Sequence, residues 1–329
     1  MSESTSRGPL DYLSELDNIS SELENKRGKH IILMIFHDDA FITRDVVDDL
    51  EFFLEEHDLS SKEGIDVILH TLGGDADAAY HIGILLQKLA GERTLSFIVP
   101  RMAKSAGTLL ACSGDKIIMT PISELGPVDP QVYVESTRTW VSAKVVRDSF
   151  GQTLEIFRDR VIKDLLREIA GKGYEISEAV NSIVKPFAEA ALSGIPITEL
   201  GHYDSLINHV RKLLVELLSN KMFKQSSIKP EGSVMQQSSD ADSVAYTLVS
   251  EYSYHGKVIH LDEAKKLGLC IEELSGEERK LAFDLYKTAR KFFKFVDELI
   301  IPMKALIGSP PITVYPLKHG LVYGPKIEE

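Results

Sequence analysis

Short apolar runs alternate with helical patterns from residue 30 to residue 119 of this 329-residue chain, and this alternation constrains the fold more than any other feature. Each run is nearly continuous, as in strands that are buried on both faces. The runs lie at 30–36, 65–70, 95–99 and 116–119, and helical patterns fill 43–57, 76–90 and 105–112. Strands that alternate with helices indicate βαβ units and a largely parallel sheet. The sequence therefore predicts an α/β protein.

Changes in composition divide the chain into further segments. Residues 1–29 are polar, with leucines at helical spacing, and we expect an arm or an oligomer contact there. The predicted segments are this N-terminal arm (1–29), an α/β core (30–140), a helical region (141–223), a flexible loop poor in large apolar residues (224–244), a segment that closes the core (245–275), and a C-terminal helix with an irregular, proline-rich tail (276–329).

The charge balance limits the classes of partner. Acidic residues number 50 and basic residues 37, which gives a formal charge of −13. A net negative surface disfavours non-specific binding to nucleic acid, which needs basic patches. The sequence contains no apolar run near the ~20 residues that cross a bilayer, and its polar start does not resemble a signal peptide. We therefore expect a cytoplasmic protein with no nucleic-acid partner and no membrane segment.

A glycine pair, Gly73 and Gly74, follows the second apolar run directly, in the segment His70–Asp75. Glycines at the end of a strand let the backbone approach a ligand closely and turn its N–H groups outward. A tight turn that needs glycine for its dihedral angles explains the pair equally well. The segment is not a phosphate loop, because no Gly-Lys-Ser/Thr follows it.

Ser105 stands at the start of the next predicted helix, within the small-residue segment Ala103–Thr108. The helix dipole there favours a developing negative charge, and small neighbours leave room for a substrate carbonyl. A helix-capping serine is the ordinary explanation for this position. Consecutive turns of a parallel sheet meet at the carboxyl ends of the strands, however. N–H groups from the Gly73–Gly74 turn and from Ala106 are then candidates for an oxyanion hole beside the hydroxyl.

These motifs resemble those of the Clp-protease/crotonase superfamily, and within it the chain is similar to the serine dehydrogenase proteinase family, relatives of signal peptide peptidase A. The resemblance covers about residues 30–275. Its pieces are Ile68–Gly74, Val99–Pro100, Ser105–Thr108, Glu124–Gln131, Ser253–His255 and Glu263–Leu269. It implies a Clp-protease/crotonase-like core of repeated ββα units in a spiral, with a helical insertion and a C-terminal helix. It also implies a serine peptidase with Ser105 as nucleophile and oxyanion donors at Gly74 and Ala106.

The sequence does not decide which residue is the general base. The Clp proteolytic subunit has a histidine in the region that corresponds to 125–135, and none occurs here. Signal peptide peptidases of the superfamily use a lysine further along the chain, and Lys144 lies in the corresponding window. Its apolar neighbours favour a neutral amine that can accept a proton, although a solvated lysine at a helix start has the same pattern. His255 is an alternative base or a structural hydrogen-bonder, and Asp129 is a candidate to orient the base or bind a partner subunit.

The motifs and the resemblance together predict a serine endopeptidase that acts on a peptide or protein through an acyl-enzyme on Ser105. Superfamily members usually assemble, so we expect a homo-oligomer. The histidines lack metal-ligand spacing, and we expect neither a metal nor a cofactor. Two alternatives stay open: a non-catalytic oligomeric binding protein on the same fold, and a crotonase-type acyl-CoA enzyme with the same oxyanion hole.

Overall fold

The computed structural model describes residues 8–135, 137–172, 177, 180–186, 188–189, 197–224, 237–298 and 305–308. The chain forms two compact units. The first unit combines Met1–Val128 with Val210–Glu329, and the second consists of Asp129–His209. The first unit is therefore built from two separate stretches of sequence.

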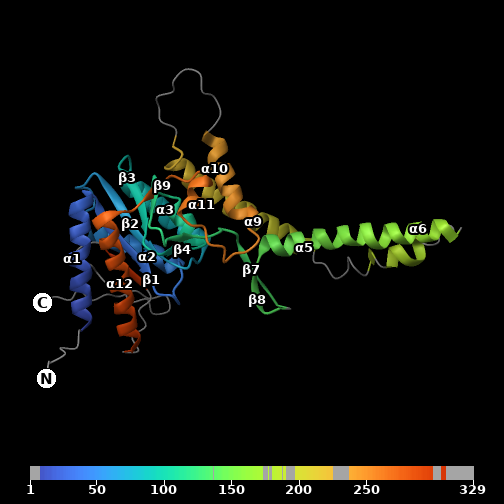
Figure 1. The fold of residues 1–329 in the computed structure, drawn as a ribbon, viewed down its shortest axis with the longest axis horizontal. Coiled ribbons are helices and arrows are strands. Elements are labelled where there is room, and N and C mark those ends of the chain that lie inside the picture. Colours follow the sequence, from blue (N-terminus) through green and yellow to red (C-terminus); the bar gives the residue numbers. More distant parts are fainter. Residues whose placement is uncertain are drawn as a thin grey trace, which may run out of the picture. The chain divides into compact units, whose positions relative to one another are not determined.

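A six-stranded sheet forms the centre of the first unit (Figure 1), in the order β10-β1-β2-β3-β5-β9. Its strands are β1 (His30–Phe36), β2 (Gly64–His70), β3 (Thr94–Val99), β5 (Lys116–Met119), β9 (Ile271–Glu273) and β10 (Ala305–Gly308). All are parallel except β10, which pairs antiparallel with β1. The predicted α/β fold with a largely parallel sheet is thus confirmed.

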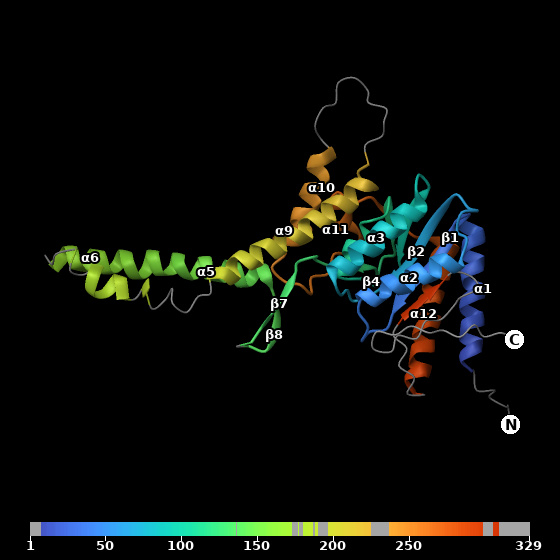
Figure 2. The same ribbon diagram turned by 180° about the vertical axis from the view of Figure 1, so that it is seen from behind.

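Helices cover both faces of this sheet. The helices of the first unit include α1 (Pro9–Arg27), α2 (Arg44–Glu56), α3 (Ala76–Ala90), α4 (Ala106–Ala111), α10 (Gln237–Tyr246), the π-helix η3 (Thr247–Glu251), α11 (Leu261–Lys266) and α12 (Gly276–Glu298). Parallel strands are joined by right-handed crossovers, so α2, α3 and α4, which connect consecutive strands, lie on one face. Helices α1 and α12 lie side by side on the other face (Figure 2).

The core under α1 and α12 is a row of aligned aliphatic side chains. Leu33 of β1 is opposite Ile68 of β2, which is opposite Ile98 of β3, which is opposite Ile118 of β5. All four are fully buried and pack with apolar side chains from both helices, among them Leu16 of α1. The segment expected to be an arm is therefore, over Pro9–Arg27, a helix of the core.

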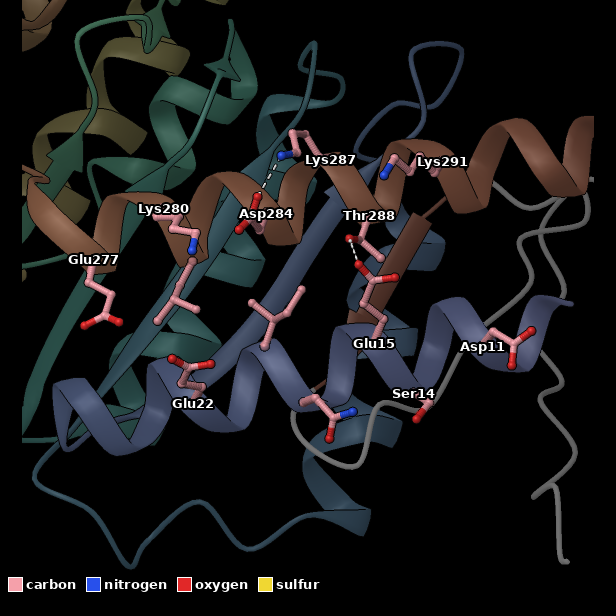
Figure 3. Close-up of a pocket in the computed structure, with 13 residues that line it drawn as sticks. Asp11, Ser14, Glu15, Glu22, Glu277, Lys280, Asp284, Lys287, Thr288 and Lys291 are labelled. Atoms are coloured by element: carbon pink, nitrogen blue, oxygen red, sulfur yellow. Dashed lines mark hydrogen bonds and ion pairs between the residues drawn. The ribbon is translucent and has the colours of Figure 1, made fainter. Parts of the chain in front are cut away.

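A groove of about 990 Å³ lies between α1 and α12 and is lined by side chains of both helices (Figure 3). Charged side chains dominate its lining, including Asp11, Glu15, Glu22, Lys280, Lys287 and Lys291. The Thr288 hydroxyl donates a hydrogen bond to Glu15 at 3.1 Å and joins the two helices. None of the sequence-predicted site residues lines this groove.

The second unit contains a hairpin and long helices with little apolar burial. Its elements are β7 (Gln131–Val134), β8 (Thr139–Ser142), α5 (Ala143–Ile156), the π-helix η1 (Phe157–Ile162), α6 (Lys163–Lys172), the π-helix η2 (Val180–Val184) and the start of α9 (Ile197–Asn220). Trp140 is 65% exposed and Ile156 is 57% exposed. In α5, Ala143 is the buried residue.

Two predicted segments fall partly outside the described residues. The expected flexible loop at 224–244 includes 225–236, which are not among them, and α10 occupies its end. In the tail that the sequence predicts to be irregular, the described residues Ala305–Gly308 form strand β10 instead. Among the described helices, none has the length and hydropathy needed to cross a membrane.

Candidate active site

The glycine turn and the serine turn are joined by backbone hydrogen bonds. The Thr71 N–H donates to the Met102 carbonyl at 3.0 Å, and the Lys104 N–H donates to the Thr71 carbonyl at 3.1 Å. Met102–Ala103 forms the short strand β4, which pairs in parallel with β6 (Glu124–Leu125). Two turns and the Leu-Gly-Pro motif at 125–127 therefore meet at the carboxyl ends of β2 and β3.

Ser105 has a strained backbone, with φ 50° and ψ −119°. Among the described residues, Arg138 is the one other non-glycine residue with positive φ. Such a conformation costs about 1–3 kcal/mol and persists where the surroundings enforce it, often at functional sites. Ser105 is the residue before α4, but its side chain makes no capping hydrogen bond, and it is half-buried. Helix capping therefore does not explain this serine.

The strain at Ser105 is held by the side chain of Thr108. Its hydroxyl donates to the Ala103 carbonyl at 2.7 Å and accepts the Gly126 N–H at 2.9 Å. Thr108 is fully buried, so these two hydrogen bonds are protected from water. They fix both sides of the serine turn at once.

Glycine is required at both positions of the neighbouring turn. Gly73 has φ 113°, and a Cβ there would lie 2.8 Å from the Ser105 Cβ. Gly74 has φ 147°, and a Cβ there would lie 2.2 Å from the Ile42 carbonyl oxygen. The backbone at Gly73 thus lies directly against the serine, at a distance that no other residue allows.

Two backbone N–H groups beside Ser105 have no acceptor among the described residues. These are the N–H groups of Gly74 and Ala106. The Gly73 N–H differs, because it donates to the Thr71 hydroxyl at 3.0 Å. The Gly73 carbonyl accepts the Ile42 N–H at 2.8 Å, which orients the turn. Gly74 and Ala106 are therefore the donors available to a substrate oxygen.

Lys144, the predicted base, lies in the first turn of α5 in the second unit. Its Nζ lies 3.1 Å from an Asp148 carboxylate oxygen. Partial burial opposes ionisation of Asp148, but hydrogen bonds from Arg147 and Lys144 outweigh it and lower its pKa. An ion-paired ammonium donates protons to its partner and has no free lone pair. The Ser-Lys dyad, which would link residues of different units, stays a prediction.

The two supporting residues also stay predictions. Asp129 is the first residue of the second unit. His255 is half-buried in the first unit, on the segment that precedes Ile259. Leu125 and Ile259 exchange backbone hydrogen bonds of 2.9 and 3.0 Å, which places this segment beside the Leu-Gly-Pro motif.

His70 ends β2 directly before the glycine turn and is nearly inaccessible, with 2% of its surface exposed. Its ring meets the Tyr286 ring edge-on at 4.7 Å. Burial lowers the pKa of His70 to about 4, so the imidazole is neutral near pH 7. A deeply buried neutral ring fits a role in packing the base of the turn. Elsewhere in the described part of the chain, no three His, Cys, Asp or Glu side chains gather into a potential metal site.

Both turns lie in the part of the chain, residues 11–149, that resembles a described protein family. Residues 11–149 match the family model of ClpP-like SDH-type serine proteinases. Uncharacterized protein MJ0137 of Methanocaldococcus jannaschii is 27% identical over 302 residues, 88% of this chain and 85% of its own length. Uncharacterized protein MJ1495 of the same organism is 36% identical over 122 residues, 34% of this chain and 40% of its own length.

Among solved structures, the chain is similar to two variants of the 1510-N membrane-bound stomatin-specific protease. One has a serine replaced by alanine; its TM-score is 0.41 at 14% identity, covering 72% of this chain and 77% of that one. The other has a lysine replaced by alanine and holds a substrate peptide; its TM-score is 0.39 at 15% identity, covering 72% and 73%.

Proposed function

We propose, since residues 11–149 match the family model of ClpP-like SDH-type serine proteinases, that this chain cleaves peptide bonds through an acyl-enzyme on Ser105. The family match confirms the resemblance predicted from the sequence motifs. One observation carries the assignment of the nucleophile. Ser105 holds a strained backbone and a hydroxyl that caps nothing, next to two N–H groups without an acceptor in the described chain.

The proposed reaction starts with attack of the Ser105 hydroxyl on a peptide carbonyl carbon. The carbonyl oxygen becomes an oxyanion, and the N–H groups of Gly74 and Ala106 donate hydrogen bonds to it. One such donor is worth about 10²–10³ in rate in a serine protease. The base passes the serine proton to the leaving amine, and water then hydrolyses the ester on Ser105. Gly73 serves as a spacer, because its own N–H is used by Thr71.

We assign the base to Lys144, with His255 as the alternative. Because Asp148 binds the Lys144 ammonium, the dyad requires this ion pair to open and the amine to lose its proton. The base is thus the part of the proposed mechanism that depends on a change in its surroundings.

The remaining proposals follow from the superfamily resemblance. The substrate is a peptide or protein, and the active form is a homo-oligomer. The cytoplasmic location is proposed separately, from the charge and hydropathy of the sequence. Asp129 is assigned to orient the base or to contact a neighbouring subunit.

Labelling with a fluorophosphonate probe, read by intact mass, tests the proposal. Wild type gains one adduct, Ser105→Ala gains none, and Ser60→Ala, a change at an exposed serine outside the turns, labels like wild type. Loss of labelling in Lys144→Ala supports the lysine, whereas loss in His255→Ala moves the base to the histidine. Absence of an adduct on the wild-type oligomer supports the non-catalytic binding protein. Turnover of an acyl-CoA by Ser105→Ala supports the crotonase-type enzyme.

A further inference from the structure

We infer that Lys104, the residue before the nucleophile, is a positioning residue that clamps the serine turn with all three protons of its ammonium group. The inference rests on the proposed function and adds a residue to it. The lysine stands within the otherwise small-residue segment Ala103–Thr108, so it needs an explanation of its own.

The Lys104 Nζ meets three acceptors. A Glu124 carboxylate oxygen lies at 2.9 Å, the Leu125 carbonyl oxygen at 3.1 Å and the Lys257 carbonyl oxygen at 3.5 Å. An ammonium group has three donors and no acceptor, so these partners account for every proton. The side chain is 15% exposed, which limits competition from water. All three partners are acceptors, and none is the Ser105 hydroxyl, which fits a positioning role for Lys104 and not that of the base.

The acceptors of Lys104 come from two segments that are distant in the sequence from each other. Glu124 and Leu125 form β6, and Lys257 lies in the segment that carries His255. The main chain of Lys104 is tied as well, because its carbonyl accepts the Gly107 N–H at 2.7 Å. Lys104 thus holds the serine turn to β6 and to the closing segment from a single position.

Gly126 makes room for this clamp. A Cβ at Gly126 would lie 3.0 Å from the Lys104 Cδ, so a side chain there would push the lysine stem aside. The Gly126 N–H also donates to Thr108, which holds the other side of the serine turn. The position of Lys104 therefore explains why the Leu-Gly-Pro motif has a glycine at residue 126.

Glu124 is kept ionised for its role as acceptor. Partial burial opposes ionisation, but hydrogen bonds from Lys104 and Arg101 outweigh it and hold the pKa of Glu124 below its usual range. Arg101 is fixed in turn by the Ile122 carbonyl at 3.1 Å. The carboxylate is consequently a fixed anchor at neutral pH.

The clamp matters for catalysis because the Ser105 backbone is strained. A residue with φ 50° and ψ −119° relaxes when its surroundings loosen, and the hydroxyl then moves. A displacement of 1 Å at a reacting group costs about 10²-fold in rate. Loss of the clamp should therefore lower the rate of acylation and leave substrate affinity nearly unchanged.

The test compares Lys104→Met, which keeps the stem and removes the charge, with wild type. Lys116→Met is the matched control, because Lys116 is a partly buried lysine paired with a glutamate at the amino end of β5, the opposite end of the sheet. We measure the second-order rate of fluorophosphonate labelling from pH 5 to pH 9 and, with a peptide substrate, kcat and KM. Lys104→Met should label about 10- to 100-fold more slowly at every pH and lower kcat with little change in KM. Lys116→Met should match wild type.

Two further variants separate positioning from a role in folding. Lys104→Arg keeps a cation for Glu124 but cannot place three donors on the same converging acceptors, and it should recover part of the rate. Glu124→Gln should slow labelling on its own, and adding it to Lys104→Met should cause little further loss, because both changes break one unit. If Lys104→Met does not fold, the same labelling rates are measured for Lys104→Arg and Glu124→Gln, and these two variants test the inference.

Three results would overturn the inference. If folded Lys104→Met labels as fast as wild type, the clamp does not position the serine. If Lys104→Met does not fold, the same result with Glu124→Gln leads to the same conclusion. A Lys104→Met profile that loses a limb of its pH dependence would make Lys104 the base instead. Wild type that does not label would remove the proposed function and this inference with it, whereas the first two results leave Ser105 as the nucleophile.

Discussion

The serine turn in the first unit and the start of α5 in the second unit are organised in opposite ways. Around Ser105 the neighbouring groups are buried and hydrogen-bonded, and the strained backbone is held from both sides. Around Lys144 the helix buries little, and the amine is bound by a carboxylate of its own helix. The proposed nucleophile and oxyanion donors are thus preorganised, whereas the proposed base is not. The difference predicts where substitutions act through geometry and where they act through charge.

The largest effect is expected at the nucleophile. Ser105→Ala should reduce peptide hydrolysis by about 10⁴-fold or more, because the residual rate comes from binding and the oxyanion hole alone. Circular dichroism should show an unchanged fold, since the Ser105 side chain makes no capping bond. If the pure variant still hydrolyses peptides at the wild-type rate, Ser105 is not the nucleophile.

The next effect is expected at the base, where charge decides. Lys144→Ala should lower the labelling rate by about 10²–10⁴-fold. Asp148→Asn should raise the rate at neutral pH, because the Lys144 side chain is then no longer bound by the carboxylate 3.1 Å away. Lys163→Ala is the control, as Lys163 forms a similar pair with Asp159 in the same unit. Equal rates in all three variants would contradict a lysine base.

Substitution of the glycine turn should act through geometry. Gly74→Ala should destabilise the protein by about 3 kcal/mol or more and abolish labelling, because the new Cβ meets the Ile42 carbonyl oxygen at 2.2 Å. Gly91→Ala also places alanine at positive φ, 55°, but nothing lies within 4 Å of its Cβ. It should cost about 1 kcal/mol. Urea unfolding measures both, and equal losses would show that the turn tolerates movement.

Asp49 differs from the buried, hydrogen-bonded polar groups around Ser105, because its carboxylate is buried without a partner among the described residues. It is fully buried on α2, and neither carboxylate oxygen has a hydrogen-bond partner. Burial, with smaller contributions from Asp45 and Asp48, raises the pKa of Asp49 to about 7. Because the unfolded chain releases this proton near pH 4, the free energy of unfolding should fall as the pH rises from about 4 to 7.

Asp49→Asn should remove that pH dependence and exceed wild type by about 2 kcal/mol at pH 8. Urea unfolding at pH 5 and pH 8 checks the prediction. Parallel pH curves for the two proteins would show that Asp49 is already ionised in the folded state.

The smallest effect is expected from relief of backbone strain. Ser105→Gly should stabilise the inactive protein by about 1 kcal/mol, since glycine adopts φ 50° freely. Arg138→Gly, at φ 52° in the β7–β8 turn, should change stability by less than about 0.5 kcal/mol, because an exposed turn stores little strain. A loss of stability in Ser105→Gly would mean that the serine turn is not strained.

The local parts of the fold could be predicted from the sequence, and the distant contacts could not. Periodicity and flanking residues give β1, β5 and α3 with the bounds that the structure has. The β10 pairing with β1 joins Phe36 to Ala305, and nothing near either residue signals it. Likewise, the two acceptors of Lys104 at Leu125 and Lys257 lie 21 and 153 residues away.

The candidate site divides in the same way. Small residues around Ser105 and the adjacent glycines indicate a crowded turn, and the structure has one. Which N–H groups are already occupied depends on partners such as the Thr71 hydroxyl, which accepts the Gly73 N–H only in the folded chain. The sequence ranks Gly73 with Gly74 as a donor, because both residues look alike without those partners.

The antiparallel pairing of β10 with β1 has a consequence for how the protein is made. β10 comes from residues 305–308 of a 329-residue chain, yet it covers the outer edge of the first strand of the sheet. During synthesis that edge stays open until residues 305–308 have left the ribosome, and an open apolar edge invites pairing with other chains. Truncation before Ala305 would therefore be expected to yield aggregates even though both turns of the candidate site are intact.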